Sequence, residues 1–343
     1  MKAKQLWFTK PYTIEIREQD VEPLKHGEVF VRSICSAISA GTEQLVYRGQ
    51  LPAGLDLDSD IVSLTNNDGN YPLQYGYATV GVIEQVASKE NEMLIGKNVF
   101  AFYPHTSHFN IKLDQLIFLP EDIKPESAVF LANMETAVNL AMDGNPRIGE
   151  SVIIAGQGVV GLLLSGILSQ FPIANLYALD HIEKRRSTSK LFGVKNSYDS
   201  RSGQDTDNLK QIMEKNYPGG GCDLIYEVSG SPEALNLAIE LCGYTGRIVV
   251  GSWYGTKSAD IQLGGKFHRN RVQIISSQVS TIASDLTGRW DKARRFQTTW
   301  EMIRKLHPER LISHRIPFES ALDAYQLLDK SPHVTLQTLL IHQ

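Results

Sequence analysis

The sequence predicts a two-domain α/β protein, in which a β-rich domain accompanies a doubly wound parallel sheet. Residues 1–120 break into short β-branched and aromatic runs separated by Gly, Pro and Asn, which is typical of strands. Apolar strands and helix-length segments then alternate through residues 151–280, as they do around a parallel sheet. The length of 343 residues suits two domains rather than one.

Composition narrows the class of protein. The chain is 42% hydrophobic and 21% charged, which is typical of a globular protein. A formal net charge of −4 and a pI near 6.2 argue against nucleic acid as the main partner. No segment has the roughly 18 apolar residues of a membrane span, so we expect no membrane partner. Because the three cysteines are scattered and no signal-like core is present, we expect a cytoplasmic protein without disulfides.

Four strands and a helix are expected before residue 150. The segment at 50–74 is polar and rich in turn residues, which predicts a loop or lid. Residues 125–143 carry apolar side chains at helical spacing and predict a helix. The expected strands are Thr13–Arg17, Glu28–Ile34, Thr79–Val86 and Asn98–Phe102.

The most informative segment runs from residue 151 to residue 180. An apolar strand, Val152–Ala155, leads directly into a G-x-G-x-x-G turn and a Leu-rich helix, and a second strand, Leu176–Leu179, ends at Asp180. The first glycine makes the tight turn, the second lets a pyrophosphate approach, and the third lets helix and strand pack closely. The helix N-terminus then favours phosphate. We therefore expect a dinucleotide to bind the run Gly156, Gln157, Gly158, Val159, Val160 and Gly161.

Asp180 lies at the usual distance, about 20 residues on, for an acid that binds the adenosine ribose. Its carboxylate would repel a 2′-phosphate, which favours NAD over NADP. Four basic residues that follow Asp180 could partly offset this preference: His181, Lys184, Arg185 and Arg186. Of these we include Arg185 in the cofactor site.

Later strands are expected at 223–228, 247–251 and 272–276, and a final one at 335–342, while Ser231-Pro232-Glu233 should begin a helix. Residues that follow the carboxyl ends of parallel strands lie where ligands bind. On this basis we assign Ser229, Gly251 and Ser252 to the cofactor, and Trp253 and Tyr254 to the substrate. We also assign His268 and Arg269 to the substrate, because they lie in a short basic loop that could grip a carboxylate or phosphate. The two aromatic residues could instead pack against a neighbouring domain, and His268 and Arg269 could form a solvated face or a subunit contact, as could Arg289, Arg294 and Arg295.

Together with the glycine run, four segments resemble the medium-chain dehydrogenase/reductase superfamily across nearly the full length of the chain. These are GTEQLVYRG at 41–49, QYGYATVGVIEQV at 74–86, GKNVFAF at 96–102 and GRIVVGSWYG at 246–255. The resemblance implies a GroES-like catalytic domain of residues 1–132 and 281–343 and a Rossmann domain of residues 133–280, with NAD(P) in the cleft between them. It also implies a homodimer paired through the strand near 272–277. A further similarity points to the bacteriochlorophyllide dehydrogenase branch.

Three positions depart from the zinc-type members of this superfamily. Where those members carry a Cys, a His and a third ligand, this chain has Ala40, Tyr77 and Ala132, and it lacks the loop of four cysteines that holds a structural zinc. Alanine has no donor atom and a phenol is a poor zinc ligand at neutral pH. We therefore expect a site without zinc.

Four residues are candidates for the chemistry. Tyr77 could donate a proton to a substrate oxygen or only fill the vacated metal space. Thr42 matches the position of a proton-relay hydroxyl in zinc-type members, and Glu43 that of an acid next to the metal site, which could simply pair with an arginine. His105 could act as an acid or base, or be an ordinary loop histidine, and an extended segment would place it opposite His108.

Three functions fit these observations. The first is zinc-independent hydride transfer between NAD(H) and an alcohol or ketone. The second is NAD(P)H-dependent reduction of an enone or quinone, whose developing charge is delocalised and needs less stabilisation than that of a simple ketone. The third is a nucleotide-binding protein that has lost catalysis. The sequence does not name the substrate.

Overall fold

The computed structural model describes residues 1–52, 69–217 and 219–342, and its internal contacts divide the chain into two compact units. Unit 1 comprises Met1–Ala132 with His307–Gln343, and unit 2 comprises Asn133–Leu306. We predicted boundaries after residues 132 and 280, whereas the second boundary falls after Leu306 because helix α8 (Lys292–Leu306) packs within unit 2. Most of the predicted loop or lid, residues 53–68, lies outside the described residues.

Unit 1 is built mainly from antiparallel strands. A seven-stranded sheet has the order β14-β15-β3-β4-β5-β7, with β6 also paired to β3, and β1 and β2 form a separate two-stranded sheet. Among the described strands of the larger sheet, only the β14–β15 pair is parallel. The strands are β1 (Lys2–Lys10), β2 (Thr13–Asp20), β3 (Glu28–Ile38), β4 (Thr79–Val86), β5 (Asn98–Ala101), β6 (His108–Lys112), β7 (Leu116–Phe118), β14 (Ile312–Pro317) and β15 (Gln337–Ile341).

Burial explains two differences from the predicted strands of unit 1. Strand β1 was not expected, but its alternate residues Leu6 and Phe8 are fully buried in the core. Strand β3 runs four residues past the predicted end at Ile34, because it pairs with both β4 and β15 and is almost wholly buried. The helices of this unit are α1 (Glu43–Arg48), α2 (Pro125–Ala128) and α9 (Ala321–Lys330).

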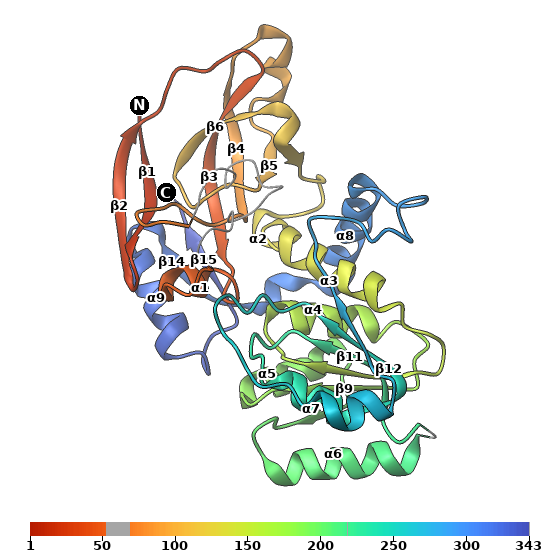
Figure 1. Cartoon of the computed structure of the whole chain (residues 1–343). Coiled ribbons are helices and arrows are strands. Elements are labelled where there is room, and N and C mark those ends of the chain that lie inside the picture. The colour runs from red at the N-terminus through yellow and green to blue at the C-terminus, as the bar shows by residue number, and fades with distance from the viewer. Residues whose placement is uncertain (53–68, 218, 343) are drawn as a thin grey trace. The chain divides into compact units, whose positions relative to one another are not determined.

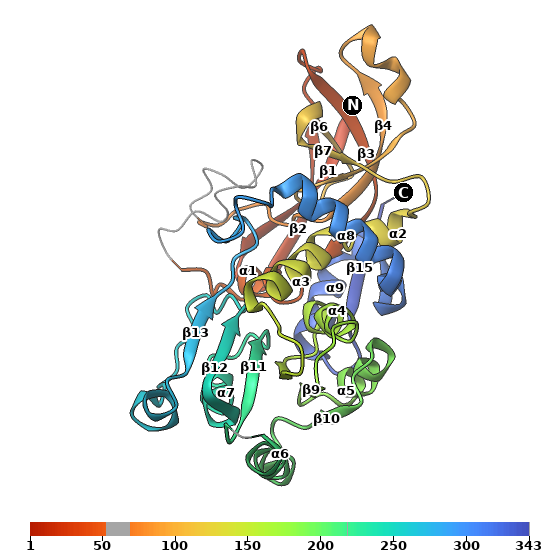
Figure 2. The same cartoon turned by 90° about the vertical axis from the view of Figure 1, so that its right-hand side faces the viewer.

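Unit 2 contains a six-stranded parallel sheet, which confirms the predicted fold class. The strand order is β10-β9-β8-β11-β12-β13, so the chain winds outward from the central β8 on one side and then from β11 on the other. Figure 2 shows β11, β12 and β13 in succession toward that edge. The strands are β8 (Ser151–Ala155), β9 (Asn175–Leu179), β10 (Asn196–Tyr198), β11 (Cys222–Glu227), β12 (Cys242–Val250) and β13 (Gln273–Ser276).

Helices cover both faces of this sheet. Helices α4 and α8 contact each other on one face, and α6 and α7 contact each other on the opposite face (Figure 1). Burial of the α4 side chains Leu162, Leu163 and Leu164 stabilises the unit by roughly 1.5–3 kcal/mol each. The helices are α3 (Leu131–Gly144), α4 (Val159–Leu168), α5 (Glu183–Ser189), α6 (Gly203–Asn216), α7 (Ala234–Leu241) and α8.

Two predicted helices differ in detail. The segment at 125–143 forms two helices, α2 and α3, because the chain breaks at Val129 and Phe130. Helix α7 begins at Ala234 rather than just after Ser231, since Ser231-Pro232-Glu233 forms the preceding turn, whose Ser231 carbonyl accepts from Ala234 N. In the described part of the chain, no helix is long and apolar enough to cross a membrane.

Candidate functional site

The last residues of the six strands of unit 2 are aligned in register and form one row across the sheet. Tyr198, Leu179, Ala155, Glu227, Val250 and Ser276 are neighbours in register across the sheet. The residues directly after this row therefore share one carboxyl edge, which is where parallel sheets bind ligands. They are Asp199, Asp180, Gly156, Val228, Gly251 and Ser277.

The glycine turn after β8 is shaped by close backbone contacts. Gly156 has a φ of +102°, and a Cβ there would lie 2.6 Å from the Ser229 backbone. A Cβ on Gly161 would lie 2.0 Å from the carbonyl oxygen of Gly156, so only glycine lets α4 approach the turn. In contrast, Gly158 faces open space, with nothing within 4 Å of an added Cβ. These are the three roles expected for a pyrophosphate-binding turn.

The rest of the glycine run divides between the edge and the core. Val159 and Val160 begin α4 and are half-buried, so the amide donors of the helix N-terminus are at the edge. The Gln157 side chain is fully buried and turns inward, where its Oε1 accepts from Ser165 Oγ at 3.0 Å. Gln157 therefore contributes its backbone N–H to the site rather than its side-chain amide.

Asp180 ties the end of β9 to the glycine turn. Its Oδ2 accepts from Gln157 N at 2.8 Å, and its Oδ1 accepts from Ile182 N at 2.8 Å. The side chain is almost fully buried, with His181 and Arg185 each 3.8 Å from one of its oxygens. An ionised carboxylate offers about four acceptor positions, so two remain for further donors.

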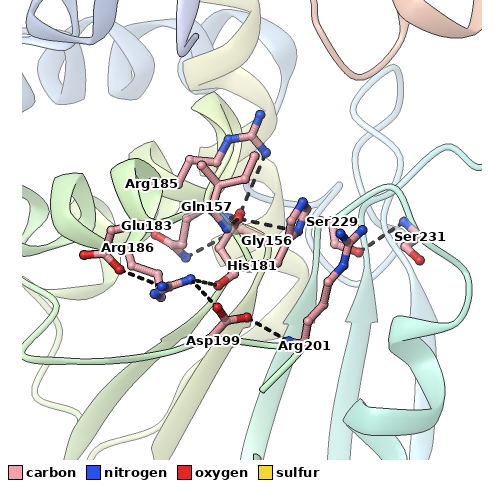
Figure 3. A network of polar contacts seen from close by, with 12 residues as sticks. Gly156, Gln157, His181, Glu183, Arg185, Arg186, Asp199, Arg201, Ser229 and Ser231 are labelled. Carbon is pink, nitrogen blue, oxygen red and sulfur yellow. Dashed lines mark hydrogen bonds and ion pairs between the residues drawn. The ribbon is translucent and has the colours of Figure 1, made fainter. Parts of the chain in front are cut away.

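The basic residues beside Asp180 differ in how far they are bonded within the protein (Figure 3). Arg186 is engaged within the protein, because it donates to the Asp180 carbonyl at 2.8 Å and pairs with Glu183 and with Asp199. Arg185 is freer, since its buried Nε has no hydrogen-bond partner in the described part of the chain. Burial lowers the pKa of His181, and Asp180 opposes that shift.

A second carboxylate, Glu227, organises the edge beyond β11. It accepts from Ser229 through both N, at 2.8 Å, and Oγ, and from Tyr254 Oη at 2.5 Å. Burial and this neighbouring carboxylate raise the pKa of Tyr254. Ser252 Oγ accepts from Gly230 N at 2.9 Å, so the turns after β11 and β12 are joined. Trp253 remains 38% exposed at this edge.

The predicted substrate residues His268 and Arg269 lie elsewhere. Their neighbour Asn270 contacts the start of β12, where its carbonyl accepts from Thr245 N and its side-chain amide donates to the Cys242 carbonyl. This is the amino edge of the sheet, opposite the ligand-binding edge. The side chains of His268 and Arg269 are exposed there, so their placement gives no support to a role in substrate binding.

In unit 1 a fully buried carboxylate, Glu43, stands at the centre of a polar network. Its Oε1 accepts from Ser39 N at 2.8 Å, and its Oε2 contacts His105 Nε2 at 2.9 Å and accepts from Tyr325 Oη. The expectation that Glu43 pairs with an arginine is thus not met, because its partners are a histidine, a tyrosine and a backbone amide.

The network continues from His105 to the end of the chain. His105 Nδ1 lies 2.7 Å from Ser36 Oγ, which lies 3.0 Å from His342 Nε2. Burial lowers the pKa of His342 to about 3, and its ring stacks on Phe318. His105 is therefore a core residue bonded at both ring nitrogens. His108 stacks on Phe30 instead.

Tyr77 joins this network at its edge. Its hydroxyl donates to Ser39 Oγ at 2.5 Å, and Ser39 is the residue whose backbone N–H is held by Glu43. Thr42 precedes helix α1 and is half-buried, and its side chain makes no capping hydrogen bond to that helix. The structure thus brings Tyr77, Glu43 and His105 into one network through Ser39, a residue that the motifs did not single out.

The residues present in unit 1 do not fit a catalytic zinc ion. Ala40 and Tyr77 pack against the same apolar cluster, and Ala132 is buried. The ring of His105 rests against Gly76, so that an added Cβ would lie 2.7 Å from it, and its nitrogens are already bonded to Glu43 and Ser36. Among the residues described, no three His, Cys, Asp or Glu side chains gather where they could hold a metal.

Comparisons with known proteins agree with this architecture. Residues 159–298 match the family described as zinc-binding dehydrogenase. A D-guloside 3-dehydrogenase of Escherichia coli K12 is 23% identical over 351 residues, covering 97% of this chain and 98% of that protein.

Two solved structures share the fold. An alcohol dehydrogenase of Escherichia coli CFT073, solved with NADH, has a TM-score of 0.79 at 20% identity and 99% coverage of both chains. A galactitol-1-phosphate dehydrogenase of Escherichia coli has a TM-score of 0.76 at 20% identity, covering 98% of this chain and 99% of its own. The similarity to the bacteriochlorophyllide dehydrogenase branch stays a prediction.

Proposed function

We propose that this dehydrogenase, a relative of the zinc-binding dehydrogenase family, transfers a hydride between NAD(H) and an alcohol or ketone at a site without zinc. One observation carries the proposal. Asp180, bridged to the Gln157 backbone, and the open Gly158 lie on one edge of the sheet, as a dinucleotide site requires. The nicotinamide ring supplies the hydride when it is bound.

The residues of the edge fit the cofactor in the following way. The backbone N–H groups from Gly158 to Gly161 would hold the pyrophosphate, and the two remaining acceptor positions of Asp180 would take the ribose hydroxyls. A 2′-phosphate would meet the buried Asp180 carboxylate, which favours NAD. Arg185 and His181 lie close enough to soften that preference.

We assign the proton to Tyr77, acting together with Thr42 on the substrate oxygen. In ketone reduction the phenol would give its proton to the oxygen that becomes the alcohol, and the Ser39 hydroxyl would then turn to donate to the phenolate. Glu43 and His105 would hold Ser39 in place rather than touch the substrate. Hydrogen bonds would thus provide the charge stabilisation that zinc provides elsewhere.

The names of the relatives favour a polyhydroxylated substrate. One is named a D-guloside 3-dehydrogenase and another a galactitol 1-phosphate 5-dehydrogenase, and both positions carry a secondary alcohol in a sugar or polyol. We therefore place an alcohol/ketone pair ahead of an enone or quinone.

The test combines cofactor titration, metal analysis and a substrate panel. The purified protein should quench or shift NADH fluorescence on binding, with weaker binding of NADPH, and should contain no stoichiometric zinc. It should oxidise members of a panel of polyols and secondary alcohols with NAD, and its activity should survive a chelator. Activity on enones alone, or NADH binding without turnover on any compound, would contradict the proposal in favour of the other two functions.

Tyr77→Phe tests the proton donor. We expect the rate of the hydride step, measured by stopped-flow NADH absorbance, to fall about 100-fold, in keeping with general acid catalysis. The Kd for NADH should be unchanged, because Tyr77 is not part of the dinucleotide edge. Unchanged turnover in this variant would remove Tyr77 from the mechanism.

A homodimer and a cytoplasmic location complete the proposal. Strand β13 is one of the two edge strands of the described sheet, and its Ile274 is 39% exposed, so pairing of two β13 strands would cover it. The three cysteines are free and buried, as expected in a reducing compartment. Light scattering gives the oligomeric state directly.

A further inference from the structure

A buried arginine in unit 2 differs from both alternatives that the sequence left open for it, a solvated face or a subunit contact. Arg295, on α8, is 0% exposed. Its Nε and Nη2 donate to one oxygen of Glu135 on α3, at 3.0 and 2.8 Å, and its Nη1 donates to Asn139 Oδ1 at 2.7 Å. Figures 1 and 2 show these two helices side by side.

The same guanidinium also holds a loop. Nη2 donates to the Val279 carbonyl at 2.5 Å and Nη1 donates to the Thr281 carbonyl at 3.0 Å. Both carbonyls belong to the segment that follows β13. All the hydrogens of the guanidinium are thereby used, two of them on this loop and three on α3.

A second contact fixes the start of that loop. Ser277, the first residue after β13, donates from its Oγ to Asp143 Oδ2 at 2.6 Å, and Asn139 Nδ2 lies 3.1 Å from the same Oγ. The segment from Ser277 to Thr281 is therefore attached to α3 at both ends, directly at one and through Arg295 at the other.

The position of this loop gives the attachment a function. Ser277 follows the same row of strand ends as Asp180 and Gly156. If Asp180 holds the adenosine ribose after β9 and the turn after β8 holds the pyrophosphate, the nicotinamide half of the dinucleotide would be held by residues that follow β11, β12 and β13. The clamped loop thus lies on the nicotinamide half of the edge.

We infer that Arg295 is a positioning residue for the nicotinamide half of the cofactor, acting through the loop Ser277–Thr281. The inference rests on the proposed dinucleotide site. It predicts that loss of the clamp weakens recognition of NADH but not of ADP-ribose, which has the same adenosine and pyrophosphate groups and no nicotinamide ring. A role confined to joining α8 and α3 would change both affinities alike.

The test compares the Kd values for NADH and ADP-ribose by calorimetry. Removing Arg295 alone would leave Glu135 as an unpaired buried charge, so the main variant is the double substitution Arg295→Met with Glu135→Leu, which replaces both charges by apolar side chains. We expect its NADH Kd to rise at least tenfold, with the ADP-ribose Kd within twofold of wild type. Arg295→Lys should be intermediate.

Ser277→Ala is a second test variant, which leaves the buried ion pair of Arg295 and Glu135 intact. Its NADH Kd should rise about threefold with no change for ADP-ribose. Arg294→Met is the matched control on the same helix, because that guanidinium lies over the Trp290 ring and should leave both affinities unchanged. Equal shifts for NADH and ADP-ribose in the double variant and in Ser277→Ala, or no shift in either, would overturn the inference. A wild-type protein that binds neither compound would instead contradict the proposed function.

Discussion

Two buried carboxylates, Asp180 in unit 2 and Glu43 in unit 1, are held in opposite ways. Asp180 accepts hydrogen bonds from the backbone amides of Gln157 and Ile182. Glu43 receives one from a backbone amide, while its other contacts are the side chains of Tyr325 and His105. The first arrangement is set by the path of a short turn, whereas the second needs side chains from distant parts of the chain.

This difference separates two kinds of sensitivity. A carboxylate bound by backbone amides depends on the turn that presents them, so the critical neighbours are glycines. A carboxylate bound by side chains depends on each of those side chains, because losing one leaves a buried group without its partner.

Glu43→Gln should be the most damaging of these changes. It replaces one acceptor oxygen of a fully buried carboxylate by an amide group that donates, so at least one of the two buried partners, His105 and Tyr325, loses its hydrogen bond. Each buried group left unpaired costs about 1–3 kcal/mol. Urea unfolding at pH 7 measures the loss. Glu84→Gln is the control in the same unit, because its pairing with Arg32 is partly exposed and should be worth no more than about 1 kcal/mol. Equal losses in the two variants would show that the network around Glu43 is not stabilising.

In unit 2 the corresponding change is in a glycine. Gly161→Ala places a Cβ 2.0 Å from the Gly156 carbonyl oxygen. This substitution should lower the free energy of unfolding by about 2–3 kcal/mol and should also weaken cofactor binding. Gly158→Ala is its matched partner, since nothing lies within 4 Å of the new Cβ. We expect that variant to unfold like wild type while its NADH Kd rises, because the methyl group occupies the space of the pyrophosphate. If both variants kept wild-type NADH affinity, the turn would not be the phosphate site.

The His342 end of the unit 1 network predicts a dependence on pH. Burial lowers the pKa of His342 to about 3 from its ordinary 6.5, with His105 and His108 adding to the shift. Between these values the unfolded chain binds a proton that the folded protein does not, so the stabilisation is present above pH 6.5 and is lost as the pH falls toward 3. Between pH 7 and pH 5, titration of His342 should lower the free energy of unfolding by about 2 kcal/mol.

The measurement is urea unfolding at pH 7 and pH 5 for wild type and His342→Gln, which cannot titrate. The wild-type loss should exceed that of the variant by the contribution of His342. Parallel losses in the two proteins would mean that the pKa of His342 is the same in the folded and the unfolded chain.

The same contrast explains what the sequence could predict. Strands β8 and β9, the glycine turn and Asp180 lie within one stretch of about 30 residues, where spacing alone fixes the geometry. The network of Ser36, Glu43, His105, Tyr325 and His342 has no such spacing, because long-range strand pairing brings its members together. Arg295 was expected on a solvated face or in a subunit contact for a similar reason, because the sequence of a helix does not specify which neighbouring element buries it.

The aligned strand ends in unit 2 also fix the distances between the residues that follow them. Neighbouring strands lie about 4.8 Å apart, so the four steps from β9 to β13 measure about 19 Å along the edge. One residue inserted in any of these strands would shift its end by about 3.3 Å and turn its side chains to the opposite face. We therefore expect insertions and deletions to be tolerated in the loops that follow these strand ends. They should not be tolerated within the strands, whose lengths keep the strand ends in register.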